Sequence, residues 1–284
     1  MTKVDQFESI FRSALHDTYE YTLIDVKSVL VVTDLEAEAA KSFLKEIQGF
    51  LNILGTSVTW TVLNKSDYST TEELLDKVSA HNPDLICSYR NLFSKDWKFK
   101  HSLGSFLDVL VQQTQGPVMV LPHPEAGYKY DHALQDTDRI MALTDHLSGD
   151  HNLINYAVRF APIDGKVYLT HIEDEKVFGR YIDAISKIPA IETEEANDLI
   201  AEQLLKAPQD FIESCRQVLE THNLNLEIES VVEFGQRLRD YKKMIQDHKI
   251  DLLIMNSRSE DHLAMHGMVY PLAVEIRQIP LLLL

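Results

Sequence analysis

Three short segments of this chain recur in the same order further along it, and this internal repeat restricts the fold more than any other feature. A set of segments that recurs in a fixed order is typical of a duplicated structural unit. The matching pairs are VLVVTD (Val29–Asp34) with IMALTD (Ile140–Asp145), PDLICS (Pro83–Ser88) with IDLLIMNS (Ile250–Ser257), and GPVMVL (Gly116–Leu121) with IPLLLL (Ile279–Leu284).

The separation between the matching segments grows along the chain. We therefore expect a first copy at 27–122 that lacks about one helix–strand unit, and a more complete second copy at 138–284. The stretch 123–137 is polar and contains proline and glycine, as is typical of an interdomain linker. Residues 1–26 carry apolar side chains at helical spacing, which predicts an additional N-terminal helix.

Apolar runs alternate with amphipathic stretches in both copies, which predicts an α/β fold with two tandem doubly wound parallel sheets. The predicted strands are Lys27–Asp34, Ser57–Leu63, Pro83–Cys87, Pro117–Leu121, Asp138–Asp145, Lys166–Ile172, Leu226–Phe234, Asp251–Met255 and Pro280–Leu284. The predicted helices are Glu36–Leu54, a helix from the Ser69 and Thr70 caps to about His81, Ser102–Gln115, Asn152–Phe160, Thr193–His222 with a break near Pro208, Gln236–His248 and Met268–Gln278. Glu173–Ala190 is predicted to be an irregular insertion.

Ligands of doubly wound sheets bind at the carboxyl ends of the strands, where the strand order reverses. The candidate sites are therefore the Thr33-Asp34 and Thr144-Asp145 turns and the loops after Cys87 and Met255. Each aspartate either contacts a ligand or bonds its own downstream backbone, as Asp does in many turns.

The charge of the chain excludes some classes of partner. With 27 Lys and Arg against 44 Asp and Glu, the net charge is −17, so we expect neither nucleic-acid binding nor attraction to anionic membranes. No stretch of about 18 consecutive apolar residues predicts a membrane span, and Met1–Glu20 lacks the apolar core of a signal peptide. Cys87 and Cys215 share no metal-type spacing, which favours reduced thiols and a cytoplasmic location.

The duplicated pattern resembles universal stress proteins of the tandem two-domain type. The resemblance rests on the strand that ends in Thr144-Asp145, on Val232–Gly235 entering a helix, on the strand Asp251–Met255, and on the last strand, in which a proline precedes apolar residues. It implies a Rossmann-like, adenine-nucleotide alpha hydrolase-like fold and a role in stress response. It also implies that Asp34 and Asp145 contact the base or ribose of a nucleotide, or an ordered water.

Many members of this family bind ATP through Gly-x-x-Gly, about nine further residues, and Gly-Ser or Gly-Thr at a helix start. Glycines let the backbone approach phosphates, and the helix N–H groups face the anion. In the second copy Asn256 and Ser259 stand at the first two glycine positions, and Gly267 stands at the third. With ATP or AMP as the implied ligand, the candidate nucleotide-binding residues are Thr144, Asp145, His171, Asn256, Ser257, Arg258, Ser259 and Gly267.

The first copy departs further from the motif. Tyr89 and Leu92 stand at the first two glycine positions, where bulky side chains would crowd a triphosphate. Gly104-Ser105 matches the final pair of the motif. It is either a residual phosphate-binding turn or, with Asp108, a plain Ser-x-x-Asp helix cap. The degenerate first-copy site consists of Thr33, Asp34, Gly104 and Ser105.

Other motifs predict no chemistry of their own. His262 and His266 have the spacing of a metal-binding pair on a helix, but no further ligand is readable nearby, so we predict no metal site. Lys95 begins a small basic and aromatic stretch that would contact a nucleotide or an acidic partner, or lie in solvent. No acid–base or nucleophile arrangement is visible, so no catalytic residue is assigned.

The apolar last strand of each copy must be paired or covered, because an exposed apolar edge promotes aggregation. In the family that the chain resembles, these strands pair across a dimer, so we expect Val118–Leu121 to pair with Leu281–Leu284 as an internal pseudo-dimer, with a homodimer through the same strands as a further option. Three functions remain open: a nucleotide-dependent regulator of an unknown protein partner, an adaptor with both sites degenerate, and an enzyme such as a weak ATP hydrolase.

Overall fold

The structure of the chain is a computed structural model that describes residues 18–99, 102–144, 147–188, 192–257 and 269–284. The helix predicted ahead of the first strand lies outside these residues. Thr18–Val26 contain no helix or strand and cross the surface of the second part of the chain. In this segment the Tyr19 hydroxyl donates to Asn155 Oδ1 at 2.6 Å, and the Tyr19 backbone N–H donates to Ser214 Oγ at 3.0 Å.

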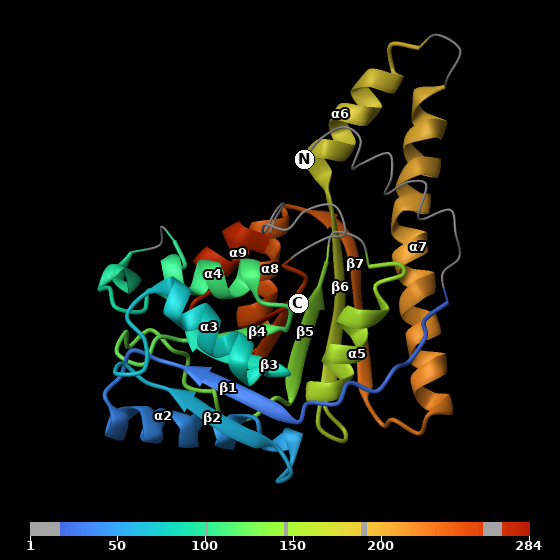
Figure 1. Cartoon of the computed structure of the whole chain (residues 1–284). Helices are drawn as coiled ribbons and strands as arrows, with labels where there is room; N and C mark the ends of the chain where they lie inside the picture. The colour runs from blue at the N-terminus through green and yellow to red at the C-terminus, as the bar shows by residue number, and fades with distance from the viewer. Residues whose placement is uncertain (1–17, 100–101, 145–146, 189–191, 258–268) are drawn as a thin grey trace.

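Nine strands form one continuous sheet at the centre of the molecule (Figure 1). They are β1 (Ser28–Val32), β2 (Thr59–Leu63), β3 (Leu85–Tyr89), β4 (Val118–Leu121), β5 (Arg139–Leu143), β6 (Lys166–Asp174), β7 (Glu227–Gly235), β8 (Leu252–Met255) and β9 (Leu281–Leu283). Their order is β2-β1-β3-β4-β9-β8-β5-β6-β7, and all neighbours are parallel except β4 and β9. The predicted α/β fold class is therefore confirmed.

The antiparallel β4–β9 pair joins what the sequence predicts as two sheets. Met119 lies opposite Leu282 in this pair, so the predicted pairing of the two apolar strands is present. Both residues are fully buried, which protects two strand edges that would otherwise be exposed. We call β1–β4 with their helices the first half, and β5–β9 with their helices the second half.

The two halves have the same strand order, apart from one strand. The second half is ordered β7-β6-β5-β8-β9 and the first half β2-β1-β3-β4. If β1 corresponds to β5, the first half lacks only a counterpart of β7. The pairing registers agree, because Val29 lies opposite Leu85 just as Ile140 lies opposite Leu252. This arrangement fits the predicted absence of one helix–strand unit, while the domain boundaries stay predictions.

Eight α-helices and two 3-10 turns are described. They are α2 (Ala37–Phe50), η1 (Asn52–Leu54), α3 (Thr71–His81), η2 (Asp96–Lys98), α4 (Ser105–Gln113), α5 (His151–Phe160), α6 (Glu175–Ile185), α7 (Thr193–Thr221), α8 (Arg237–Asp247) and α9 (Val269–Glu275). The N-cap of α3 is as predicted, since Thr70 Oγ1 accepts a hydrogen bond from the backbone N–H of Glu73. None of the helices in the described ranges combines the length and apolar character that crossing a membrane requires.

Two predictions in the second half are wrong. The segment expected to be irregular contains the end of β6 and the helix α6, whose first turn is capped by the Asp174 carboxylate through the backbone N–H of Lys176 at 2.9 Å and of Val177 at 3.0 Å. Helix α7 also continues through Pro208, which is buried within it. Packing of the following turns around Phe211 outweighs the hydrogen bond that proline removes. Helix α6 and the adjoining part of α7 project from the sheet as an arm (Figure 1).

Two arginines connect the halves through helix C-termini. Arg90 follows β3 and is only 1% exposed; its Nε donates to Ala273 O at 3.1 Å and its Nη2 to Ile276 O at 2.6 Å, at the end of α9. In the opposite direction, Arg159 of α5 donates to Leu54 O at 3.3 Å, just after α2. Carbonyls at helix ends lack partners within the helix, so each half supplies donors that the other half needs. The buried apolar side chains accordingly form one cluster.

Candidate functional site

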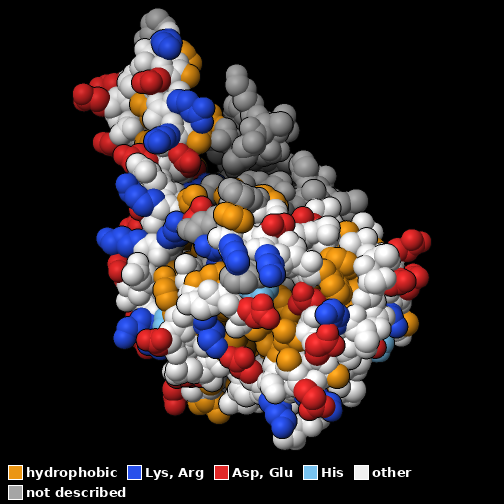
Figure 2. Space-filling model, turned by 90° about the vertical axis from the view of Figure 1, so that its left-hand side faces the viewer, with side chains coloured by type: hydrophobic (Ala, Val, Ile, Leu, Met, Phe, Trp, Pro, Cys, Tyr) orange, Lys and Arg blue, Asp and Glu red, His pale blue; other side chains and the backbone are white. Residues whose placement is uncertain are grey.

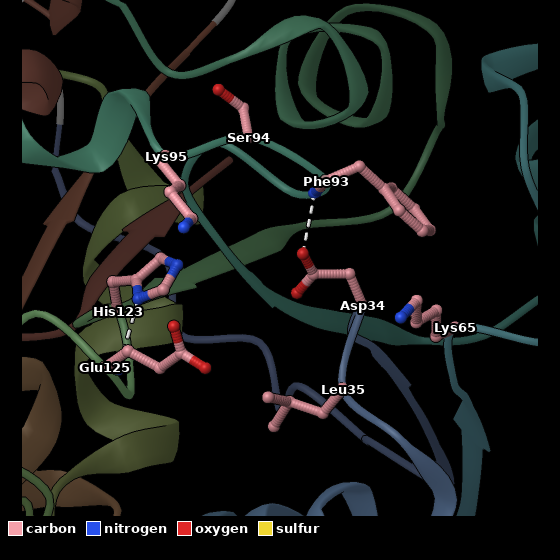
Figure 3. A pocket seen from close by; sticks show the side chains of 8 residues that line it. All are labelled: Asp34, Leu35, Lys65, Phe93, Ser94, Lys95, His123 and Glu125. Atoms are coloured by element: carbon pink, nitrogen blue, oxygen red, sulfur yellow. Dashed lines mark hydrogen bonds between the residues drawn. The ribbon is translucent and has the colours of Figure 1, made fainter.

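A cavity of about 300 Å³ lies at the carboxyl edge of the first half (Figure 3). Loops that follow four parallel strands meet there, which is where doubly wound sheets bind ligands. Figure 2 looks onto this side of the molecule, where acidic and basic side chains are intermixed. The cavity is lined by Asp34, Leu35, Lys65, Phe93, Ser94, Lys95, His123 and Glu125.

The Asp34 carboxylate is bound by the protein itself. It accepts a hydrogen bond of 2.7 Å from the backbone N–H of Phe93 and a second from the Tyr89 hydroxyl. The same hydroxyl lies 2.7 Å from Thr33 Oγ1. Burial, together with the hydrogen bond to Asp34, raises the pKa of Tyr89, so the phenol stays protonated. The loop after β3 thus holds the Asp34 carboxylate in the wall of the cavity.

The prediction that Asp34 bonds its own downstream backbone is wrong, whereas its contact with a ligand stays a prediction. Asp34 bonds the backbone of a distant loop, at Phe93, and not its own downstream backbone. The local turn contact is made by Thr33, whose Oγ1 accepts a hydrogen bond of 3.1 Å from the backbone N–H of Leu35. Tyr89 and Leu92 are both buried at this edge, and their crowding of a triphosphate stays a prediction.

Besides Asp34, the titratable side chains of the cavity are Lys65, Lys95, His123 and Glu125. Lys65 pairs with Glu36 at 2.8 Å, whereas Lys95 has no ion pair with any residue in the described ranges and its ammonium group points into the cavity (Figure 3). Burial lowers the pKa of His123 to about 4, so its imidazole is neutral near pH 7. The charges of the lining are therefore mixed, with two lysines against the carboxylates of Asp34 and Glu125.

The Gly104-Ser105 pair stands at the start of α4, but Ser105 is not the N-cap that the sequence predicts. Gly104 has φ 89° and is itself the N-cap of α4, so Ser105 lies inside the helix and caps nothing. A Cβ at Gly104 would lie 2.7 Å from the Asn91 Cα, and the backbone N–H of Asn91 donates to Leu103 O at 2.8 Å. The loop after β3 thus covers the start of α4. Burial raises the pKa of Asp108 in the first turn of this helix.

At the carboxyl edge of the second half, Thr144 and Asn256 meet at Asp150. Asn256 Nδ2 donates to Asp150 Oδ2, and the Thr144 side chain also hydrogen-bonds this carboxylate. Asp150 caps α5 by accepting a hydrogen bond of 3.1 Å from the backbone N–H of Leu153. Burial raises the pKa of Asp150 to about 6, and these hydrogen bonds only partly oppose the rise. The ends of β5 and β8 thus place a hydroxyl, an amide and a carboxyl group together.

Two other candidates of the second half have separate roles. Ser257 donates from its backbone N–H at 2.7 Å and from its hydroxyl at 2.6 Å to Leu284 O, so it secures β9. His171 is buried on β6 and its Nε2 lies 3.2 Å from Glu173 Oε2. The register of β5 and β6 ends with Leu143 opposite Thr170, so Thr144 and His171 each follow this last pair, and the His171 imidazole is directed to Glu173.

Several candidates lie outside the described residues. They are Asp145, Arg258, Ser259 and Gly267, together with His262 and His266. The sequence analysis did not identify Lys65, His123 and Asp150, although each had a signal. Lys65 and His123 follow predicted strands closely, and Asp150 directly precedes a predicted helix, as N-cap residues do.

Comparisons with known proteins address the fold. No protein-family model and no curated protein matches the sequence. Among solved structures, a universal stress protein from Archaeoglobus fulgidus DSM 4304 is similar with a TM-score of 0.53 and 12% identity, over 90% of this chain and 95% of that chain. A functionally unknown protein from Pseudomonas aeruginosa PAO1 is similar with a TM-score of 0.49 and 14% identity, over 91% of this chain and 92% of that chain. At these identities the likeness concerns architecture, and the chain has the fold of a universal stress protein.

Proposed function

We propose that this chain is a stress-response regulatory protein that binds a nucleotide, ATP or AMP, at the carboxyl edge of its second half. Nucleotide binding would favour one conformation and so change the affinity for a protein partner. The observation that carries this proposal is the difference between Tyr89 in the first half and Asn256 in the second.

Tyr89 and Asn256 occupy corresponding places in the two halves. Cys87 lies opposite Val31 of β1, and Ile254 lies opposite Ala142 of β5, so the residue two positions further along is Tyr89 in one half and Asn256 in the other. The Tyr89 ring is fully buried and fills its edge of the sheet. The amide at the corresponding place is much smaller than a tyrosine ring, and this difference supports a planar base at the edge of the second half.

The groups around Asn256 suit a nucleotide chemically. An amide provides two donors and an acceptor, a hydroxyl provides a donor and acceptors, and a carboxylate provides acceptors. Thr144, Asn256 and Asp150 supply one of each. Such a mixed set can recognise the edge of a base or the hydroxyls of a ribose. This set supports a small polar ligand, and we assign no catalytic residue.

The test is a thermal-shift measurement on the full chain with ATP, AMP and cyclic nucleotides. A ligand at about 100 times its dissociation constant adds about 2.7 kcal/mol to the stability of the folded state. Asn256→Tyr introduces the first-half residue and should abolish the shift. Tyr89→Phe is the matched control, because it changes the corresponding position of the first half and should keep the shift. Equal shifts in both variants would contradict the proposed location.

The alternative function is an adaptor that binds no nucleotide in either half. The closure of Asp34 by Tyr89 and Phe93 favours this alternative for the first half. If the second half is also closed, none of the nucleotides will shift the melting temperature of the wild-type protein, and the nucleotide proposal fails. Phosphate release from ATP, measured in the same samples, addresses the remaining option of a weak hydrolase.

A further inference from the structure

A second cavity, of about 600 Å³, lies in the second half where the start of α8 meets α6 and α9. None of Thr144, Asp150 and Asn256 lines it, so it differs from the site proposed above. We call it the basic cavity. It is lined by Asp174, Lys176, Gln236, Arg237, Leu238, Arg239, Lys242 and Pro271.

Cationic side chains make up half of this lining, although the chain has a net charge of −17. Grouping like charges around one space is unfavourable unless an anion compensates them. Among the lining residues that the structure describes, the only carboxylate is that of Asp174, and it is occupied as the N-cap of α6 through the backbone N–H groups of Lys176 and Val177. The lining therefore has an excess of positive charge.

Arg237 gives the cavity a fixed cation. It is 8% exposed, and its Nε donates to Ile172 O at 2.8 Å. Its Nη2 lies 4.0 Å from Glu173 Oε2. Because hydrogen bonding and burial fix the guanidinium, little side-chain entropy is lost when an anion binds beside it. Arg237 is also the first residue of α8, where the helix dipole favours negative charge.

The other three cations are exposed and can change partners. Lys242 Nζ lies 3.0 Å from Glu275 Oε2, and Arg239 Nε lies 2.7 Å from Asp240 Oδ1. Exposed ion pairs of this kind contribute little to stability, so a doubly charged anion can compete for these groups. Lys176 has no ion pair with a residue in the described part of the chain.

We propose that the basic cavity binds a small phosphate-bearing anion. Phosphate oxygens accept several hydrogen bonds and carry the charge that arginine and lysine side chains recognise. Leu238 and Pro271 add an apolar wall, so the phosphate can belong to an organic molecule as well as to inorganic pyrophosphate. The inference does not depend on the nucleotide site at Asn256.

Isothermal titration of the full chain with inorganic pyrophosphate tests the proposal. We expect saturable binding to the wild type, and at least tenfold weaker binding to a Lys176→Ala, Lys242→Ala double variant. Both lysines are exposed, so the fold should persist. Lys206→Ala is the matched control, because this exposed lysine pairs with Asp210 on α7 and lines neither described cavity; its affinity should equal that of the wild type.

Absence of pyrophosphate binding, or equal affinity in the double variant and the wild type, would overturn the proposal. Parallel titrations with ribose 5-phosphate and with inorganic phosphate distinguish an organic phosphate from a free one. If ribose 5-phosphate binds more tightly than inorganic phosphate, the apolar wall contributes to binding. Asn256→Tyr should bind pyrophosphate as the wild type does. The proposal for the basic cavity is therefore tested independently of the proposal for the nucleotide site.

Discussion

The backbone N–H of Phe93 donates a 2.7 Å hydrogen bond to the Asp34 carboxylate, which joins the loop after β3 to the end of β1. The same carboxylate accepts a hydrogen bond from the Tyr89 hydroxyl. Asp34 therefore stabilises the first half, in the place where the resemblance to nucleotide-binding proteins implies a ligand contact.

Replacing Asp34 by alanine should destabilise the protein. The variant removes the acceptor of the exposed Phe93 N–H and one of the two partners of the Tyr89 hydroxyl, which keeps Thr33 Oγ1. A typical intramolecular hydrogen bond contributes about 0.5–1.5 kcal/mol. Asp34→Asn retains one acceptor oxygen and should lose less. Urea unfolding at pH 7 measures both, with Asp76→Ala on the exposed face of α3 as the control. Equal midpoints for Asp34→Ala and the control would show that the contact is dispensable.

The two arginines that connect the halves predict which of two substitutions lowers the stability of the protein more. Arg90→Met keeps an apolar stem but leaves the carbonyls of Ala273 and Ile276 without donors, and hydrogen bonds to charged groups contribute about 1.5–3 kcal/mol. Arg159→Met removes similar contacts from a half-buried side chain and should cost less. Both should lower the midpoint of a single unfolding transition, because the halves share one core. Two separate transitions in the wild type would contradict this shared core.

Both cysteines should be inert in the folded protein. Cys87 and Cys215 are free and fully buried. Burial raises the pKa of the Cys215 thiol to about 12 and that of Cys87 further, and the thiolate is the reactive form. A colorimetric thiol reagent at pH 8 should detect both only after a denaturant is added. Rapid labelling of one thiol in the native protein would show that its cover opens readily.

The strands could be predicted from the sequence because burial on both faces makes them continuously apolar. Strands β3, β4, β8 and β9 are buried at every position. Helix α6 does carry apolar residues at helical spacing, at Phe178, Tyr181 and Ile185, and Phe178 contacts Phe234 of β7; its interpretation as an irregular insertion overlooked this spacing. The predicted break near Pro208 is wrong because packing of the buried face of α7 outweighs the local effect of a proline on the helix.

The contacts within the sites could not be predicted, because they join residues far apart in the chain. Phe93 bonds Asp34 across 59 positions, and Arg90 reaches Ala273 across 183. The repeat identifies which strand ends correspond, and so indicates that Tyr89 and Asn256 stand at equivalent positions of the two halves. It does not indicate which side chains turn toward each other, which explains why Asp150 and His123 emerge only in three dimensions.

The pH dependence of stability should report on Asp150. Burial raises its pKa to about 6 in the folded protein, against about 3.9 in an unfolded chain. Its contribution to stability is therefore fully present below pH 4 and is lost as the pH rises through 6. Asp150→Asn cannot ionise but retains an oxygen for the Leu153 N–H. Relative to the wild type, this variant should gain on the order of 1–3 kcal/mol between pH 4 and pH 7.

Urea unfolding at several pH values from 4 to 7 measures this difference directly. Subtracting the wild-type curve is necessary because burial also raises the pKa of Asp251 to about 6, and Asp251 contributes to the wild-type curve with the same sign. That contribution is common to both proteins and cancels, since Asp251 lies at the opposite, amino-terminal edge of the sheet beside Arg139. Asp76→Asn, an exposed change on α3, should give a constant difference. A constant difference for Asp150→Asn as well would mean that its carboxyl group is solvated, and that the group around Thr144 and Asn256 opens to water.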